Sequence, residues 1–317
     1  ASDAFRTIQK AAGCMQPGDD IMIHQGTYAP FTIRASFQAS AGNPTVIEGD
    51  PAVSRDAVVI DGAGVPDAVR SEGGTGSSSA TKYLTFRHFR VKAGTNTGMN
   101  FLNIHQNITV SDVAFTDFGG MANLQNVGDN PDRAIGFDYG DAVTIENVRM
   151  TGAPGKTPAI AIKLYTNNSV VRGVYAENFQ GNFILSSSKQ NNTYENNTIV
   201  NFDCNYDDGC IQAYNSTNVI VRGNVFDNTV SVNDYNGVIG VRRLSTGERA
   251  TSVQVVGNTL IGRVNRAGRA RAVVVHKGNI VDSVIVKNNI FMLHGGTNAD
   301  AGAVTILDGC PAAIDVS

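Results

Sequence analysis

One arrangement of apolar and polar positions recurs along the chain from residue 84 onward. Two apolar residues one position apart are followed by two variable residues, a fixed position, a variable residue and a last apolar residue, as in Leu84, Phe86, Phe89 and Val91. The fixed position advances by 24, 35, 26, 23, 27, 34 and 31 residues. Strands of constant length joined by variable loops give such spacing, whereas helical repeats keep a tighter period and a 3.6-residue periodicity.

A second short apolar segment accompanies most copies of this pattern. The segments are 101–102, 135–137, 160–162, 183–185, 211–213, 239–241, 273–275 and 304–306. Two short strands per repeat, alternation with a period of two, and turns rich in glycine and asparagine predict a parallel β-solenoid. The predicted fold class is therefore all-β.

Asparagine occupies the fixed position in the last four copies, at Asn197, Asn224, Asn258 and Asn289. A buried asparagine without a hydrogen-bonding partner costs about 1–3 kcal/mol. A column of stacked amides, each bonded to the next, satisfies all four side chains. We therefore expect these residues to lie one above another at an inward-facing turn.

The first residues follow a helical pattern instead. Phe5, Ile8 and Ala12 share one helical face after Asp3, a favourable N-cap residue. The first coil of a solenoid needs a cover, so we expect residues 1–16 to form a capping helix and the coils to occupy about 20–310. Because no change of composition marks a second domain, a single domain is predicted over residues 1–317.

Composition and charge narrow the class of partner. The chain carries 25 Lys and Arg against 28 Asp and Glu, a net charge of −3, which argues against general binding to nucleic acid. No apolar stretch approaches the roughly 18 residues of a membrane span, so no membrane partner is expected.

The four cysteines match no zinc-binding spacing. Cys204 and Cys210 bracket a five-residue loop and either form a local disulfide, which would favour an exported protein, or remain free. Cys14 and Cys310 lie near opposite ends of the chain, and in an elongated fold we expect both to be free and buried.

Residues 5–12, 17–21, 26–28, 43–49 and 59–62 resemble the amino-terminal signature of secreted right-handed parallel β-helix proteins. The likeness is nearest to polysaccharide lyase families 6 and 9, which act on alginate, chondroitin-type and pectic chains. It extends over nearly the whole chain as a fold signature. The resemblance implies a single-stranded right-handed parallel β-helix with a short N-terminal capping helix, a secreted or periplasmic location and a polysaccharide substrate.

In the family 6 lyases a lysine follows a strand of this kind and an arginine lies one coil later. The resemblance places Lys163, which follows 159–162, on that lysine. Serine replaces the arginine in the next coil, and Pro158 and Ile160 stand where those lyases have two glutamates that help to hold calcium.

Side chains at equivalent positions of a parallel β-helix line up along one outer face, about 4.8 Å apart. The position after each second strand gives a predicted file of Asp138, Lys163, Ser186, Tyr214, Arg242 and His276, thickened by Tyr139, Arg243 and Lys277. Outward lysine, arginine and tyrosine side chains are also common as plain solvated residues. The alternative to a functional row is therefore an ordinary polar surface.

The chemistry that suits such a row is β-elimination on a uronic acid. A cation neutralises the carboxylate, a base takes the proton beside it, and tyrosine or histidine protonates the leaving oxygen. We expect Lys163 or Arg242 to act as base and carboxylate binder and Tyr214 as proton donor, with His276 as a further catalytic candidate. The expected substrate-binding residues are Arg243, Lys277, Tyr139 and Ser186.

Calcium is a candidate cofactor, because Asp138, Asp207 and Asp208 offer the oxygen ligands that Ca²⁺ prefers. Aspartates are also ordinary turn residues. A glycoside hydrolase would instead need two carboxylates about 5–9.5 Å apart, from Asp207 and Asp208 with Asp138 or Asp234. The remaining alternative is a polysaccharide-binding or tailspike-like β-helix without catalysis, and we expect a monomer, with a trimer left open.

Overall fold

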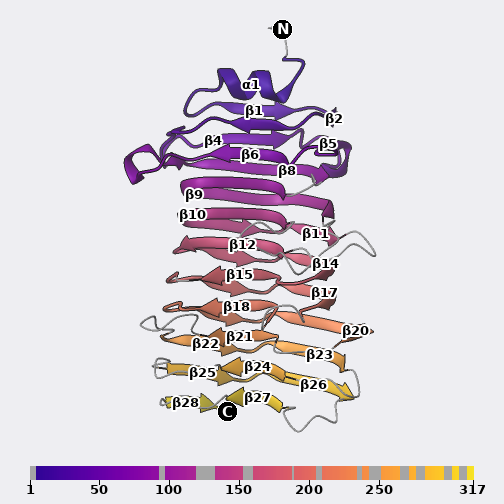
Figure 1. Cartoon of the computed structure of the whole chain (residues 1–317). Helices are drawn as coiled ribbons and strands as arrows, with labels where there is room; N and C mark the ends of the chain where they lie inside the picture. Colours follow the sequence, from indigo (N-terminus) through magenta and orange to yellow (C-terminus); the bar gives the residue numbers. More distant parts are fainter. Residues whose placement is uncertain are drawn as a thin grey trace.

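The computed structural model describes residues 5–92, 97–118, 133–152, 160–187, 189–204, 209–233, 238–242, 251–264, 271–275, 283–295, 302–306 and 313–317. The chain winds into successive coils of short strands, capped at the N-terminal end by one helix (Figure 1). Strands of neighbouring coils pair in parallel, so the molecule is a parallel β-helix. The predicted fold class is confirmed.

Three stacks of parallel strands form the wall of the β-helix. The first contains β1 (Asp20–Ile23), β4 (Thr45–Gly49), β8 (Leu84–Lys92), β9 (Thr97–Phe118), β10 (Arg133–Glu146), β13 (Val170–Arg172), β16 (Thr193–Glu195), β19 (Ile220–Arg222), β22 (Val253–Val256), β25 (Ser283–Lys287) and β28 (Ala313–Val316). The second contains β2 (Gly26–Tyr28), β5 (Val58–Asp61), parts of β8 and β9, β11 (Arg149–Gly152), β14 (Tyr175–Gln180), β17 (Thr198–Asp203), β20 (Val225–Asn233), β23 (Thr259–Val264) and β26 (Ile290–Gly295).

The third stack contains β3 (Phe31–Ile33), β6 (Asp67–Glu72), parts of β9 and β10, β12 (Ile160–Asn167), β15 (Ile184–Ser187), β18 (Ile211–Tyr214), β21 (Ile239–Arg242), β24 (Arg271–Val275) and β27 (Gly302–Ile306). The short β7 (Thr81–Lys82) pairs with β9, and two 3-10 turns, η1 (Arg55–Ala57) and η2 (Ser77–Ser79), lie between strands. The prediction of two strands per repeat was wrong, because the recurrent pattern is itself two strands that meet at a corner.

The corner between the first and second stacks explains the spacing of the recurrent pattern. The residue just before the fixed position adopts a left-handed backbone, with φ of 54° at Asn196, 63° at Gly223 and 55° at Asn288. Glycine and asparagine tolerate this conformation better than other residues. The chain therefore turns there, and the fixed residue that follows points into the interior.

The asparagine column is confirmed. The side-chain amide of Asn197 donates to Oδ1 of Asn224, Asn224 donates to Asn258, and Asn258 donates to Asn289, each at 2.9 Å. The same oxygens accept the backbone N–H of the preceding asparagine in the column, at 2.8–3.1 Å. The column thus fixes the register of successive coils from the inside.

The N-terminal helix is shorter than predicted. The helix α1 spans Ile8–Cys14, and Thr7 is its N-cap, with its side chain accepting the backbone N–H of Lys10. Ile8 and Ala11 are buried against the first coil, but Phe5 precedes the helix and is 55% exposed. A threonine hydroxyl therefore replaces the expected Asp3 cap, and Phe5 does not belong to the buried face.

The cysteines divide into a pair and an exposed thiol. Cys204 and Cys210 form a disulfide, which decides the alternative that the sequence left open. Cys14 is free as expected, but it is exposed at the last residue of α1, so the prediction that it is buried was wrong. Cys310 lies outside the described residues.

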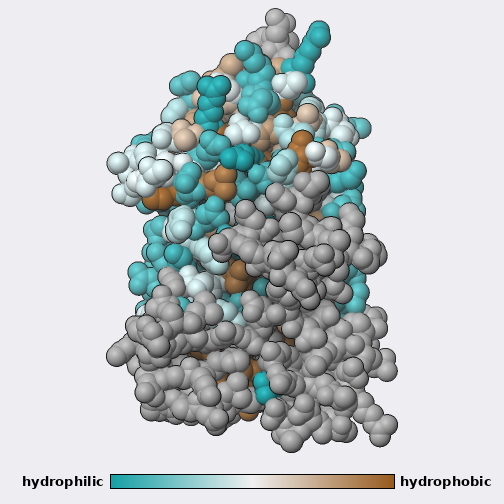
Figure 2. Space-filling view, viewed as in Figure 1, coloured by the Kyte–Doolittle hydropathy of each residue, from teal (hydrophilic) through white to brown (hydrophobic). Residues whose placement is uncertain are grey.

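The interior is apolar along its length, with the inward residues of all three stacks in one continuous core. On the face of the N-terminal coils seen in Figure 2, hydrophilic side chains dominate and apolar ones gather in small separate patches. Among the described residues no helix is long or apolar enough to cross a membrane.

We expect Asn224→Ala to lower the free energy of unfolding by about 1–3 kcal/mol for each buried group that it leaves unpaired. The substitution removes the Oδ1 that accepts from Asn197, and the amide that donates to the Tyr194 carbonyl on the preceding coil and to Asn258 on the following coil. Urea unfolding followed by circular dichroism measures the change. The matched control is Asn191→Gly, which removes exposed amide bonds to Asn168 and Asn218 but keeps a residue suited to φ of 58°. A loss in the control as large as in Asn224→Ala would contradict a special role for the buried column.

Candidate functional site

The site begins with a lysine on the outer face of the third stack. Lys163 of β12 lies between Ile162 and Leu164, which belong to the core, so its own side chain points away from the interior. It is nevertheless only 6% exposed. Its ammonium donates a hydrogen bond to Oδ1 of Asp138 at 3.1 Å and lies 4.7 Å from the ring centroid of Tyr165. Lys163 is therefore held in place by an anion and an aromatic ring.

A β-bulge in β10 turns two neighbouring side chains to the outside, and one of them contacts this lysine. Phe137 pairs with Leu164 and Gly140 with Thr166, so three steps along β10 match two steps along β12. Such an extra residue re-aims the side chains around it. Asp138 consequently reaches Lys163, while the adjacent Tyr139 also stands on the outside and is 59% exposed.

A buried arginine supports the floor of the site. Arg133 begins β10, is 1% exposed, and donates from Nε to the Thr97 hydroxyl at 3.2 Å. A Cβ atom at Gly136 would lie 2.5 Å from that Nε, so the arginine side chain occupies the space over the glycine. Gly136 is in register with Lys163, and the guanidinium therefore lies beside the lysine row.

Burial and neighbouring charged groups have opposite effects on the pKa of Arg133. Burial lowers the pKa of Arg133, whereas the charges of Asp138, Asp67 and Tyr165 raise it. An arginine keeps its proton under such conditions because its ordinary pKa is so high. The floor of the site thus carries a fixed positive charge in a medium that screens it poorly.

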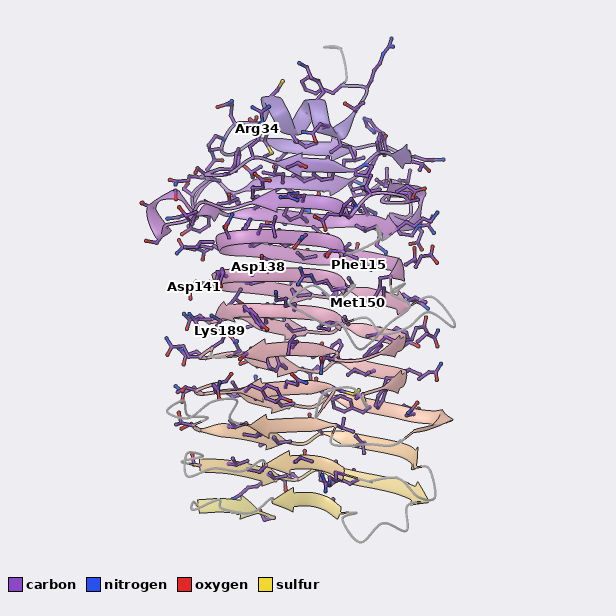
Figure 3. All side chains as sticks on the ribbon, viewed as in Figure 1. Arg34, Phe115, Asp138, Asp141, Met150 and Lys189 are labelled. Atoms are coloured by element: carbon purple, nitrogen blue, oxygen red, sulfur yellow. A yellow bond between two sulfur atoms is a disulfide. The ribbon has the colours of Figure 1, made fainter. Side chains whose placement is uncertain are left out.

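A second lysine approaches the same surface from the next coil. Lys189 follows β15 and is half-buried, and its ammonium lies 5.5 Å from the ring centroid of Tyr139. Burial lowers the pKa of Lys189. No carboxylate among the described residues forms an ion pair with it. Figure 3 shows Asp138 and Lys189 in the same part of the β-helix, with Asp141 beside them.

A further polar group continues the outer row toward the N terminus. Asn100, in register with Gly136, donates to both carboxylate oxygens of Asp67 at 3.2 and 3.1 Å. Arg70, in register with Asn100, lies 3.7 Å from Asp67 and bonds Glu72 at 3.1 Å. The charges of Asp67, Arg70 and Glu72 thus offset one another, whereas the buried Oδ1 of Asn100 has no hydrogen-bonding partner among the described residues.

The single outer file predicted from the sequence is corrected by the register. In one row, Lys163 is in register with Gly136 and Leu185. In a second row, which runs two residues later along each strand, Tyr214 is in register with Ser187 and Arg242. The reason is that the strands end at different points relative to the corner. Two parallel outer rows therefore replace one file.

The predicted site residues fall into three groups. Lys163 and Asp138 are bonded to each other, and Tyr139 follows Asp138 on the outer face. Ser186 is paired with the core residue Ala213 and is completely buried, so it points inward, and Ser187 takes the outer position. Tyr214 lies in the outer row but is 2% exposed, and for its partner Arg242 the structure describes the backbone alone. The residues that lie outside the described part of the chain are His276, Arg243, Lys277, Asp207 and Asp208.

Asp138 does not fit a calcium site as it stands. Its carboxylate faces the ammonium of Lys163, and a divalent cation there would meet a positive charge. Within the described ranges, no three His, Cys, Asp or Glu side chains gather as metal ligands would. We therefore derive no chemical step through calcium.

Sequence reasoning missed Arg133, Tyr165 and Lys189. Tyr165 lies two residues after Lys163 and so on the same face of β12, a signal that alternation alone provides. A glycine three residues after Arg133 leaves room for its side chain, but only the structure shows that the room is used. Nothing in the sequence around Lys189 indicates that it reaches across a coil.

Comparison with solved structures shows the same fold in proteins of different activity. An alginate lyase from Paenibacillus sp. str. FPU-7 matches 96% of this chain over 95% of its own, with a TM-score of 0.60 and 16% identity. A polygalacturonase from Erwinia carotovora ssp. carotovora matches 97% of this chain over 95% of its own (TM-score 0.55, 11% identity). A surface adhesin of Streptococcus pneumoniae matches 92% over 88% (TM-score 0.53, 11% identity).

No family model matches the chain, and no curated protein matches it in sequence. At such low identities the solved structures establish the parallel β-helix and leave the activity open.

The buried His105 makes the folding stability depend on pH. Its ring is completely buried, bonds the Ser71 hydroxyl at 2.9 Å, and has a pKa lowered to about 4 by burial. The folded protein keeps it neutral while the unfolded chain takes up a proton near pH 6.5, so stability is lost as pH falls from about 6.5 toward 4. We expect this group to contribute a loss of about 3 kcal/mol over that range, because each pKa unit corresponds to about 1.4 kcal/mol.

Urea unfolding of the wild type and His105→Gln at several pH values isolates this contribution, since the other acidic groups are common to both proteins. Parallel stability curves for the two proteins between pH 7 and 4 would contradict it.

Proposed function

We propose that the protein cleaves an acidic polysaccharide by β-elimination on the outer face around Lys163. The observation that supports this best is the local charge. Arg133, Lys163 and Lys189 bring three cations to this surface. Asp138 pairs with Lys163 and the charge of Asp67 acts on Arg133, whereas no described carboxylate pairs with Lys189. A half-buried ammonium without a described carboxylate partner, next to two further cations, favours an anionic ligand.

The shape of the site suits a polymer. Rows of outer side chains run along the β-helix with a rung spacing of about 4.8 Å, so a linear chain laid along them meets one coil after another. Polysaccharides are named among the substrates of the alginate lyase and the polygalacturonase that share this fold, and they are the substrate class we propose here. The disulfide between Cys204 and Cys210 supports action outside the cytosol, in the medium or the periplasm.

The proposed reaction needs two functions from the protein. The ammonium of Lys163, supported by the buried charge of Arg133, neutralises the uronate carboxylate and so makes the neighbouring C5 proton more acidic. A phenolate then takes this proton, the C–H electrons form a double bond between C4 and C5, and the bond from C4 to the glycosidic oxygen breaks. The leaving oxygen receives the proton from the phenol, and no water is consumed.

Tyr165 is the phenol we assign to the proton transfer. Its ring lies 4.7 Å from the Lys163 ammonium, and alternation along β12 puts both side chains on the same face of the strand. Tyr214, which the sequence favoured as the proton donor, lies in the other outer row, in register with Ser187, whereas Lys163 is in register with Leu185. The ammonium of Lys163 already donates a hydrogen bond to the carboxylate of Asp138, so binding a carboxylate suits it better than proton abstraction.

We expect Lys163→Gln and Tyr165→Phe each to lower turnover of the substrate polyuronate at least about 100-fold, the usual cost of losing one charge-stabilising group. The thermal melting temperature should change little, since the side chain of Asp138 is 25% exposed and water can solvate it when Lys163 is lost. The measurement is the ultraviolet absorbance of the unsaturated product, in a screen of alginate, pectate, chondroitin and bacterial exopolysaccharides with and without chelator.

Lys92→Gln is the matched control, because Lys92 pairs with Asp61 on the second stack, away from the site. Arg242→Ala, in register with Tyr214, tests the second outer row in the same assay. Full activity of the Lys163→Gln variant would rule out Lys163 as part of the active site. New reducing ends without ultraviolet absorbance would indicate a hydrolase instead of a lyase. Binding without either signal would indicate a non-catalytic β-helix.

A further inference from the structure

Tyr139 and Lys189 take no part in the chemistry proposed above, although they lie next to it. We propose that they form a separate sugar-binding subsite, which holds a carboxylate-bearing sugar adjacent to the one bound at Lys163. The inference rests on the proposed function for the class of polymer, an acidic polysaccharide. It adds a second point of recognition, and with it a dependence on the length of the substrate.

The bulge in β10 supplies the platform of this subsite. Because Asp138 and Tyr139 are consecutive and both lie on the outer surface, one side chain serves Lys163 while the other is directed to the neighbouring position. Tyr139 is 59% exposed, unlike Tyr165 and Tyr214 in the same region. An exposed aromatic ring offers an electron-rich face to the C–H groups of a sugar ring.

Lys189 supplies the charge. Its ammonium lies 5.5 Å from the centroid of the Tyr139 ring, within the range of a cation–π contact, and this contact holds both side chains at one place. Lys163 is matched by Asp138, whereas no described carboxylate pairs with Lys189. A half-buried ammonium of this kind gains from a carboxylate ligand without first having to release an internal partner.

The position of the pair fits the next sugar of the same chain. Lys163 and Lys189 belong to consecutive coils, because Lys163 pairs with Leu185 of β15 and Lys189 follows that strand. Lys189 comes four residues after Leu185, so it is displaced sideways from the row of Lys163. Consecutive coils are about 4.8 Å apart, so a polymer that crosses the rows obliquely presents successive sugars to the two lysines. The carboxylate of one sugar is then bound by Lys163, where the polymer is cleaved, and that of the next sugar is bound by Lys189.

The experiment compares oligouronates of increasing length. We expect Lys189→Gln and Tyr139→Ala each to raise KM about tenfold for oligomers long enough to reach both lysines, with kcat nearly unchanged. That factor corresponds to about 1.4 kcal/mol of binding. The shortest cleaved oligomer should be affected much less, Lys189→Arg should retain most of the affinity, and Lys92→Gln should behave as the wild type.

The double variant tests whether the two residues act on one sugar. If both contact the same ring, Tyr139→Ala combined with Lys189→Gln should cost less than the two single effects multiplied together. Independent, fully multiplicative effects would place the residues in different subsites and overturn the proposal. Equal losses for short and long oligomers would overturn it as well, since a general structural defect acts regardless of length.

Direct binding separates this inference from the proposed function. Isothermal titration of the wild type and Lys189→Gln with the same oligouronates, and with neutral oligosaccharides of equal length, requires no cleavage. If no polyuronate yields an unsaturated product but Lys189→Gln still loses affinity for the oligouronates alone, the lyase proposal fails and the subsite stands. If the wild type binds no oligouronate, or both proteins bind equally, the subsite is refuted.

Discussion

Register between successive coils is the constraint on which the remaining structure depends. At the corner between the first and second stacks, each inward asparagine bonds both the backbone and the side chain of its neighbour in the column. Every amide in the column satisfies groups on two coils, so the coils cannot slide past one another without leaving buried polar groups unpaired. Since each coil is a continuous loop of chain, fixing one corner also restricts the rows of side chains on the third stack.

A perfectly regular β-helix would align like positions but would not bring unlike groups together. The irregularity in β10 does so. Between the paired positions Phe137–Leu164 and Gly140–Thr166 the extra residue turns two consecutive side chains to the outside, which normal alternation forbids. The surrounding strands remain in register and absorb the distortion. The scaffold thus supplies rigidity, and a single local departure from it supplies the mixed charge and aromatic character of the site.

The repeat pattern was enough to predict the solenoid and the asparagine column, because both follow from spacing that the chain displays directly. Lys163 and Asp138 could also be placed near each other from the strand positions. The sequence failed where one residue of offset decides the outcome. Ser186 was assigned to the outer face, and a shift by one position puts it in the core and leaves Ser187 outside.

Long side chains set a second limit on what the sequence can predict. Arg133 covers Gly136 three residues ahead, and Lys189 reaches a tyrosine on a strand two coils back. Neither contact follows from alternation, because the rotamers of long side chains depend on the space that neighbouring coils leave. The bulge could not be predicted from the sequence either, because an inserted residue is recognised only by comparison with the strand that pairs with it.

The charges of the site also follow from the way these groups are packed. Arg133 lies beneath the surface, where water cannot screen its charge well, and Lys163 and Lys189 are partly enclosed above it. Asp138 pairs with Lys163 and Asp67 acts on Arg133, which leaves Lys189 as the cation of these three without a described carboxylate partner. Elsewhere on the surface, Arg172 pairs with Glu146 and Arg222 with Glu195, which leaves little attraction for anions there. An acidic polymer would therefore be drawn to this surface, where no described carboxylate pairs with Lys189, and the geometry of β10 and β12 would decide which of its sugars lies beside Tyr165.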